Sequence, residues 1–147
     1  MTDRFSPQKR SEIMSRISGK DTKNEILVRS FLFRHGYRFR KHKSELPGTP
    51  DIYLSKYKIA IFVNGCFWHG HSCKRGQSRP KTNAEKWRLK IEKNVIRDRK
   101  TKSMLISLGI HVIEIWECEL SSQKKRDQRL GLLLEEINNS VNPLRNG

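Results

Sequence analysis

Acidic residues are scarce in this chain of 147 residues, in which 15 Asp and Glu face 31 Lys and Arg. The formal net charge is therefore +16 at pH 7. The basic residues are spread along the whole chain rather than gathered in one tail. A folded domain with this excess usually faces phosphate, so the charge indicates a nucleic-acid-binding protein. The alternative is a basic protein without such a partner.

Long apolar runs are also missing. No apolar run reaches the roughly 18 residues that cross a membrane, and no long basic amphipathic helix is evident. The first residues lack the apolar segment of a signal peptide. We therefore expect a cytoplasmic protein without a membrane partner. With no repeat or linker, the chain suits a basic N-terminal arm (1–19) and one domain (20–147).

Cysteine is rare, and the three cysteines cannot all pair with one another. Cys66, His71 and Cys73 lie within one short segment, and Cys118 lies far along the chain. Three thiolates and one imidazole form a normal tetrahedral structural zinc site. In a reducing compartment such a cluster favours metal over disulfides. Buried unreactive thiols beside incidental histidines are the alternative.

The cysteine-rich segment follows an apolar stretch, 59–63, that reads as a buried strand and breaks at Asn64-Gly65. His69 is left over from the zinc set, and a spare imidazole near a carboxylate-bound metal is a natural general acid or base. A lone histidine can also be structural. The carboxylate nearest in the expected layout is Asp51, which opens another short strand. It could satisfy backbone N–H groups or bind a hard cation.

The remaining pattern predicts helix, three strands, helix, strand, helix, at 23–35, 37–40, 52–54, 59–63, 83–108, 110–116 and 124–140. Capping boxes at Thr22 and Thr82 are expected to start the first two helices. Ile26, Leu27, Phe31 and Leu32 are expected to face the core, and 74–81 to form a basic loop for phosphate. Antiparallel neighbours would bring Asp51 close to Asn64. The fold class is thus a single α/β domain with a central mixed sheet flanked by helices.

Two further segments could contact DNA. Trp87, Lys90 and Asn94 fall on one face of the long helix, where they could meet a base stack, a phosphate and a base edge. Alternatively, Trp87 belongs to the core and the others are solvated. In the N-terminal arm, Met14 could act as an apolar wedge in a groove or pack on the body of the domain.

This order of elements, with Pro50-Asp51 entering the second strand, resembles the core of the PD-(D/E)xK nucleases, although Phe62-Val63-Asn64 replaces the usual acidic-x-Lys. More specifically, the chain resembles the very short patch repair (Vsr) DNA mismatch endonucleases over nearly its full length. The motifs that carry this resemblance are Gly-Cys-Phe-Trp-His-x-His-x-Cys at 65–73, Leu-Pro-Gly-x-Pro-Asp at 46–51, Lys-Asn-Val-x-Arg-Asp-Arg at 93–99 and Trp-Glu-Cys at 116–118.

The resemblance implies roles for particular residues. Asp51 matches a magnesium-binding aspartate, and the backbone carbonyl of Val63 a second magnesium contact. His69 matches the catalytic histidine, and Glu25 matches a helix glutamate that holds metal-bound water or that histidine. By sequence alone, helix capping would also explain Glu25. The family's structural zinc ligands are matched by Cys66, His71, Cys73 and Cys118. The aromatic residues that the family inserts into the duplex are matched by Phe67, Trp68 and Trp87. Met14 matches an apolar residue inserted from the opposite side.

Several members of the family have histidine where this chain has Asn64. Asparagine can orient water or contact phosphate but does not titrate near neutral pH. The implied activity is a Mg²⁺-dependent nick 5′ to the thymine of a T:G mismatch in double-stranded DNA, made by a monomer. A restriction-like endonuclease that cuts matched DNA and a non-catalytic, zinc-stabilised DNA-binding module are the alternatives. The sequence does not indicate which mismatch-repair protein, if any, is a partner.

Overall fold

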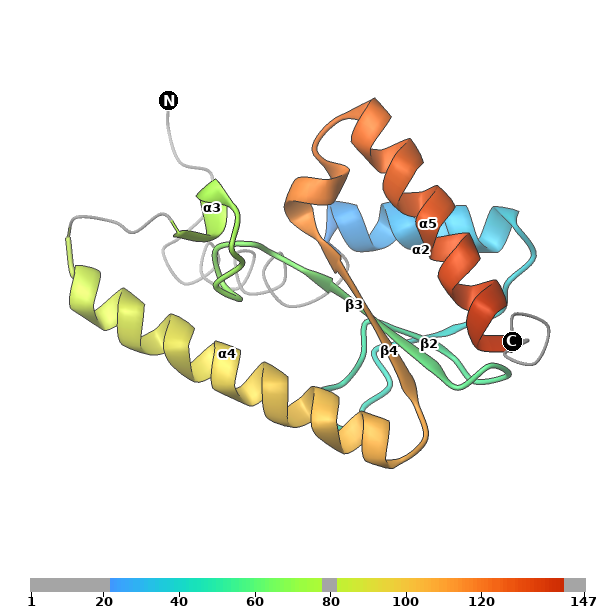
Figure 1. Ribbon diagram of the computed structural model, residues 1–147, viewed down its shortest axis with the longest axis horizontal. Helices are drawn as coiled ribbons and strands as arrows, with labels where there is room; N and C mark the ends of the chain where they lie inside the picture. Colours follow the sequence, from blue (N-terminus) through green and yellow to red (C-terminus); the bar gives the residue numbers. More distant parts are fainter. Residues whose placement is uncertain (1–21, 78–81, 142–147) are drawn as a thin grey trace, which may run out of the picture.

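The computed structural model describes residues 22–77 and 82–141 (Figure 1). The N-terminal arm, with Met14, lies outside the described residues. The described elements are α2 (Lys23–Arg34), β1 (Arg40–Lys41), β2 (Ile52–Leu54), β3 (Ile59–Asn64), α3 (Lys74–Gln77), α4 (Ala84–Ser107), β4 (His111–Trp116), the 3-10 helix η1 (Glu117–Leu120) and α5 (Gln123–Val141). Among these described segments, none is a helix both long and apolar enough to cross a membrane.

The strands form one mixed sheet in the order β1-β2-β3-β4. β1 pairs with β2, and β2 with β3, in antiparallel fashion, whereas β3 and β4 are parallel. In the parallel pair Ile59 lies opposite His111 and Asn64 lies opposite Trp116. Both strands therefore end at the same level. The predicted mixed sheet is confirmed.

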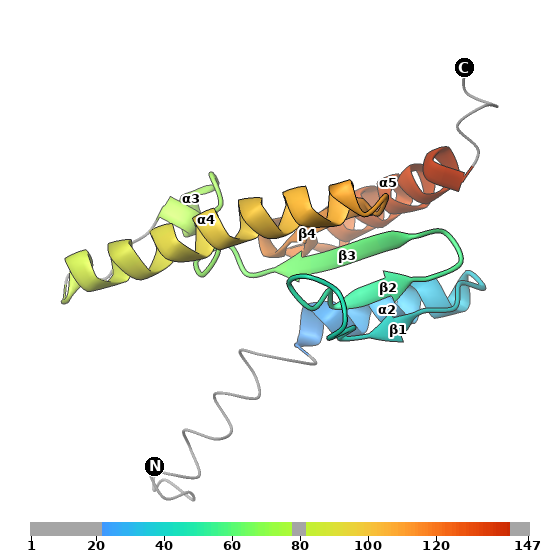
Figure 2. The same cartoon turned by 90° about the horizontal axis from the view of Figure 1, so that it is seen from below.

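Helices cover both faces of the sheet, with α4 on one face and α2 and α5 on the other (Figures 1 and 2). Side chains alternate along β3 as the pleat requires. Ile59 and Ile61 join the core cluster under α2 and α5, whereas Ala60 packs with Leu105 of α4. Because both faces are covered, the central strand is apolar almost throughout, as in buried parallel strands.

Helix α2 begins where its sequence predicts. Thr22 is the N-cap, and its side-chain oxygen accepts a hydrogen bond from the backbone N–H of Glu25 at 3.2 Å. The prediction that Ile26 faces the core is wrong, since its side chain is 47% exposed. The buried stripe instead runs through Glu25, Val28 and Leu32, at i, i+3 and i+7. Leu27 and Phe31 pack at its margin.

Three other expectations need correction. Helix α4 begins at Ala84, and its N-cap is Asn83 without a side-chain cap bond, so Thr82 does not form the predicted capping box. The strand predicted at 37–40 is only Arg40–Lys41. The basic segment after Cys73 contains the short helix α3 rather than a loop throughout.

The loop that leads into β2 rests on α4. Gly48 has a positive φ of 75°, and a Cβ there would overlap the Thr101 side chain. Gly131, in the middle of α5, has open space around its Cα instead. We expect Gly48→Ala to lower the free energy of unfolding by about 1–3 kcal/mol. The control Gly131→Ala should raise it by about 0.5–1 kcal/mol. Urea unfolding checks both, and an unchanged midpoint for Gly48→Ala would contradict the close packing of this loop.

Candidate active site and metal centres

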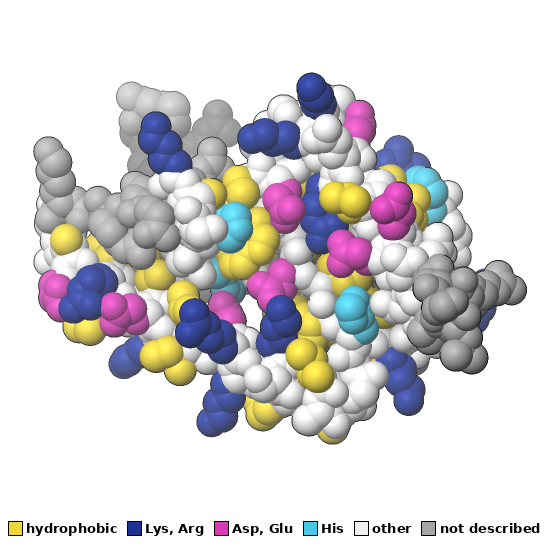
Figure 3. Space-filling model, viewed as in Figure 1, with side chains coloured by type: hydrophobic (Ala, Val, Ile, Leu, Met, Phe, Trp, Pro, Cys, Tyr) yellow, Lys and Arg dark blue, Asp and Glu magenta, His cyan; other side chains and the backbone are white. Residues whose placement is uncertain are grey.

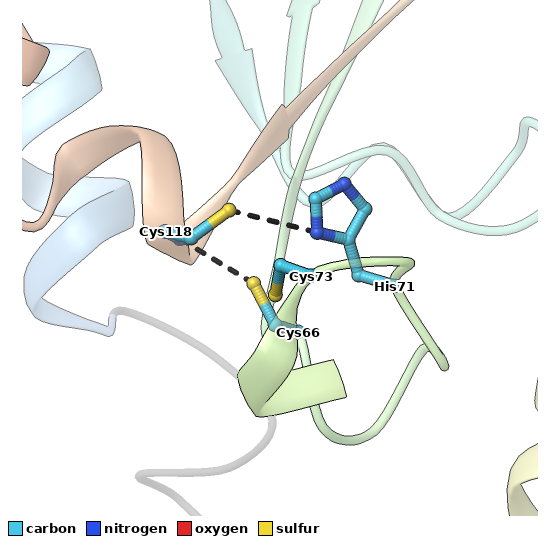
Figure 4. A group of neighbouring side chains, drawn as sticks. All are labelled: Cys66, His71, Cys73 and Cys118. Carbon is cyan, nitrogen blue, oxygen red and sulfur yellow. Dashed lines mark hydrogen bonds between the residues drawn. The ribbon is translucent and has the colours of Figure 1, made fainter. Parts of the chain in front are cut away.

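Four sulfur and nitrogen ligands converge just beyond the paired ends of β3 and β4 (Figure 4). The ligand atoms of Cys66, His71, Cys73 and Cys118 all lie within 4.8 Å of one another. Three come from the segment after β3, and Cys118 comes from η1 after β4. Sequence analysis predicted this set, and the structure brings it together. The three thiols are free of disulfides.

The surroundings of these thiols suit a metal ion of borderline softness. Backbone N–H groups donate to two of them, from Cys118 to Cys66 Sγ at 3.3 Å and from Gly76 to Cys73 Sγ at 3.4 Å. The Gly76 N–H lowers the pKa of the Cys73 thiol to about 6, whereas burial raises the pKa of the Cys66 thiol. The His71 ring is held by stacking on Trp116 at 4.1 Å between ring centroids. Three sulfurs and one imidazole in this arrangement are compatible with a four-coordinate structural metal.

A second cluster lies where β2 begins and β3 ends. The ligand atoms of Glu25, His42 and Asp51 lie within 4.8 Å of one another. Asp51 Oδ2 accepts a hydrogen bond from the Val63 backbone N–H at 2.7 Å. This bond confirms the predicted approach of the two strand ends. Glu25 is only 2% exposed, and its Oε2 lies 3.0 Å from His42 Nε2 and 3.8 Å from Arg29 Nη1.

Asp51 is an acid whose charge is poorly solvated. Burial raises its pKa from the ordinary value of 3.8 to about 6, and the nearby charge of Glu25 adds to the rise. The Val63 N–H, His42 and His69 act in the opposite direction. A carboxylate held in this state, beside a second buried carboxylate, is suited to a bound cation.

His69 has a carboxylate partner that sequence reasoning missed. Its Nδ1 lies 2.6 Å from Asp98 Oδ2. Asp98 is on α4, one turn beyond Asn94, and so continues the helix face that begins at Trp87 and Lys90. Extending the helix face of Trp87, Lys90 and Asn94 by one turn would have added Asp98 to the candidate residues, although not its pairing with His69. The pair fixes the orientation of the imidazole. With Nδ1–H donating to the carboxylate, Nε2 is the ring nitrogen that can accept a proton.

A cavity of about 310 Å³ lies beside this pair, between α4 and the ends of β3 and β4. His69, Asp98 and Asn64 line it together with the cations Arg99 and Lys102. Asn64 is 8% exposed. Glu114 also lines the cavity and pairs with Lys102 at 3.2 Å. The cavity therefore combines an oriented imidazole, a buried amide and charges of both signs.

An aromatic group lies next to the cavity, formed by Phe67, Trp68 and Trp87. Their ring centroids are 5.2–5.8 Å apart, in edge-to-face arrangements. Lys90 Nζ lies 5.2 Å from the Trp68 ring centroid and 5.6 Å from that of Trp87. Asn94 Nδ2 donates to the Trp68 carbonyl at 2.9 Å. The five residues are thus brought together, and Trp68 remains 39% exposed.

The basic side chains on one face of the described residues are spread out. On the face seen in Figure 3, Lys and Arg side chains are scattered over several elements, with acidic and histidine side chains between them. This distribution agrees with the spread of basic residues along the sequence.

Comparison with known proteins identifies the family. A family model described as "DNA mismatch endonuclease Vsr" matches residues 2–75. The type II nicking enzyme V.NmeAIP of Neisseria meningitidis is 48% identical over 96% of this chain and 100% of its own length. The chain belongs to the Vsr family. Another nicking enzyme, V.XorIIP of Xanthomonas oryzae, is 44% identical over 92% of this chain and 98% of its own length. "DNA mismatch endonuclease Vsr" of Escherichia coli is 41% identical over 92% of this chain and 87% of its own length.

Membership in the Vsr family makes this protein a DNA endonuclease, a hydrolase of phosphodiester bonds. Such an enzyme acts on DNA and belongs to mismatch repair. The resemblance drawn from the sequence motifs is therefore confirmed.

Replacing Cys118 should remove one of four metal ligands. We expect Cys118→Ser to reduce zinc below one ion per chain and to lower stability by about 3 kcal/mol or more. Atomic absorption and thermal unfolding measure the two effects. Ser72→Ala, in the same segment but without a ligand atom, is the control. Unchanged zinc stoichiometry in Cys118→Ser would remove Cys118 from the ligand set.

Asp51 should make the protein less stable at neutral pH when no divalent metal is added. Because its folded pKa is raised, the folded state binds more protons than the unfolded state between about pH 4 and 6, and stability is lost as pH rises through this window. Asp51→Asn should therefore be more stable than wild type by about 2 kcal/mol near pH 7.5 and similar below about pH 4. Urea unfolding at both pH values tests this, with the exposed Asp127→Asn as control. The same stability difference between Asp51→Asn and wild type at both pH values would refute this prediction.

Proposed function

We propose that this protein nicks one strand of double-stranded DNA 5′ to the thymine of a T:G mismatch, with Mg²⁺ as catalytic cation and Zn²⁺ as structural cation. The observation that carries the proposal is the proximity of an oriented imidazole, a buried carboxylate pair and an exposed aromatic group at one end of the sheet. The Escherichia coli relative, named a DNA mismatch endonuclease, supports it.

Asp51 would hold the magnesium ion together with the Val63 backbone carbonyl. The ion would supply positive charge to the scissile phosphate and the leaving oxygen. The residues present fit this role, because Asp51 is tied to the same residue, Val63, by its backbone N–H at 2.7 Å. Glu25 would contribute a second carboxylate from α2, held in place by His42 and Arg29.

His69 would accept a proton from the attacking water at Nε2, with Asp98 fixing the Nδ1–H tautomer. Asn64, in the same cavity, would orient water or contact the phosphate, since an amide cannot exchange a proton near neutral pH. Arg99 and Lys102 line the cavity and would favour the phosphate over bulk solvent. The division of labour thus assigns proton transfer to His69 alone.

Mismatch selectivity would come from the aromatic group. Phe67, Trp68 and Trp87 present ring edges and faces that could enter a base stack, at a cost of a few kcal/mol per opened step. A T:G wobble is easier to distort than a matched pair, so this cost is smaller there. Lys90, over two of the rings, and Asn94 would support the wedge. Met14 would enter from the opposite side.

The broader organisation follows from the same proposal. A restriction-endonuclease-like core would span 20–147, preceded by a basic arm, and the protein would act as a cytoplasmic monomer. A monomer has one catalytic site and so suits a nick rather than a double-strand cut. The +16 charge supplies non-specific affinity for the DNA backbone.

Asp98 is expected to act through His69. Asp98→Asn should lower kcat about 10²-fold or more, because the imidazole loses its fixed tautomer, while KM for DNA changes little. The control Glu92→Gln removes one negative charge from an exposed position of the same helix. A parallel change of KM in both variants would mean that only net charge matters.

The activity itself is tested with end-labelled duplexes, one carrying T:G and one carrying T:A in the same sequence, with and without Mg²⁺. A single Mg²⁺-dependent nick 5′ to the mismatched thymine is expected, leaving a 5′-phosphate. Several flanking sequences are used in parallel. Cleavage of both strands of both duplexes would identify a restriction-like enzyme, and binding without cleavage in every context would identify a non-catalytic module.

A further inference from the structure

A largely buried histidine, His42, lies beside the two carboxylates of the acidic cluster, and the proposed function gives it no chemical role of its own. Its Nε2 lies 3.0 Å from Glu25 Oε2, and its side chain is 14% exposed. Its ligand atom and those of Glu25 and Asp51 lie within 4.8 Å of one another. An imidazole nitrogen thus faces the same small volume as two carboxylates.

Each of the three side chains is fixed by a different part of the fold. Glu25 is on the buried face of α2. The backbone N–H of His42 donates to the Asp51 carbonyl at 3.2 Å, which continues the β1–β2 pairing by one residue beyond Lys41 and Ile52. Asp51 in turn is held through Oδ2 by the Val63 N–H. Its other carboxylate oxygen is not used by that bond.

We propose that His42, through Nε2, is the third side-chain ligand of a divalent-cation site shared with Glu25 and Asp51, and that this nitrogen makes the site favour Mn²⁺ over Mg²⁺. The inference rests on the proposed function, because it concerns the metal class of the same acidic cluster. It adds a nitrogen ligand to a site that otherwise consists of the Asp51 and Glu25 carboxylates and the Val63 carbonyl.

The geometry suits a six-coordinate ion. With metal–ligand bonds near 2.1 Å, two ligands at right angles around the metal are about 3 Å apart. Glu25 Oε2 and His42 Nε2 already have this spacing. Binding would replace the proton between these atoms with the metal, and the imidazole proton would then reside on Nδ1. Coordination positions not taken by these side chains and the Val63 carbonyl would be left for water and a phosphate oxygen.

The choice of metal follows from the donor set. Mg²⁺ prefers oxygen ligands and gives up water reluctantly, whereas imidazole suits first-row transition metals, whose affinities follow the Irving–Williams order. Two carboxylates and one neutral imidazole supply two negative charges, and Arg29 offsets part of that charge from 3.8 Å. A dication is therefore well compensated. Of the two cations compared, Mg²⁺ and Mn²⁺, the nitrogen favours Mn²⁺, because it is the transition metal.

The test measures metal binding without DNA. Protein purified with zinc in the cysteine cluster is titrated with Mn²⁺, and free Mn²⁺ is followed by electron paramagnetic resonance, with Mg²⁺ as competitor. Mn²⁺ is a poor competitor for thiolates, so the zinc cluster does not interfere. We expect wild type to bind one Mn²⁺ at least tenfold more tightly than Mg²⁺. His42→Gln should lose about tenfold in Mn²⁺ affinity with little change for Mg²⁺, whereas His111→Gln, at an exposed position of β4, should behave as wild type.

A second measurement needs no variant. Pulsed resonance of Mn²⁺ bound to wild type should show modulation from a directly coordinated ¹⁴N nucleus, so the inference stays testable even if His42→Gln fails to fold. Absence of that modulation, or unchanged Mn²⁺ affinity in a folded His42→Gln, would overturn it. Equal losses for Mn²⁺ and Mg²⁺ would also overturn it, since His42 would then only position Glu25. Failure of the proposed function is a different result, namely no nicking of T:G duplexes by wild type with either metal.

Discussion

The parallel register of β3 and β4 is the constraint on which the cysteine and histidine cluster depends. Because Asn64 lies opposite Trp116, the chain leaves both strands at the same level. Two residues later on each side stand Cys66 and Cys118, whose ligand atoms meet. A slip of one residue would turn every side chain of one strand to the other face and separate the thiols. The long helix α4 is the crossover that such a parallel pairing requires.

The segment from Cys66 to Cys73 carries both metal-type ligands and side chains with proposed roles in DNA binding and catalysis. Its metal-type ligands lie at both ends, and Phe67, Trp68 and His69 lie between them. Gly70, with a positive φ of 58°, brings this segment against α4, where an added Cβ would lie 2.9 Å from Val95. A bound structural ion would therefore limit the movement of the aromatic group and the imidazole together. Preorganisation of this kind lowers the cost of binding a distorted duplex.

The acidic cluster opposes the stability that the core provides. Apolar side chains on both faces of the sheet favour folding, while the burial that they create raises the pKa of Asp51 to about 6 and buries Glu25 almost completely. Buried carboxylates of this kind collect at functional sites, because a bound ligand offsets the unfavourable burial of their charge. In this protein the offset would come from a cation between the carboxylates, with His42 as its nitrogen ligand.

The sequence by itself determined the order of the four strands and the three longer helices, the ends of β2, β3 and β4 to within a residue, and the zinc-type ligand set. These features are local, because strand periodicity, turn dipeptides and ligand spacing are written in neighbouring residues. The same local rules failed at Ile26 and Thr82. At those positions the burial of a helix face and the loop before α4 decided the outcome rather than propensity or a capping motif.

Only the tertiary structure decided which distant groups meet. His69 pairs with Asp98, 29 residues away, and Glu25 pairs with His42, 17 residues away. Neither distance follows from a sequence period, since each depends on how a helix is seated on the sheet. Long-range pairing of polar groups is set by packing of the apolar ones, and it is this packing that turned scattered acids and imidazoles into an active-site candidate.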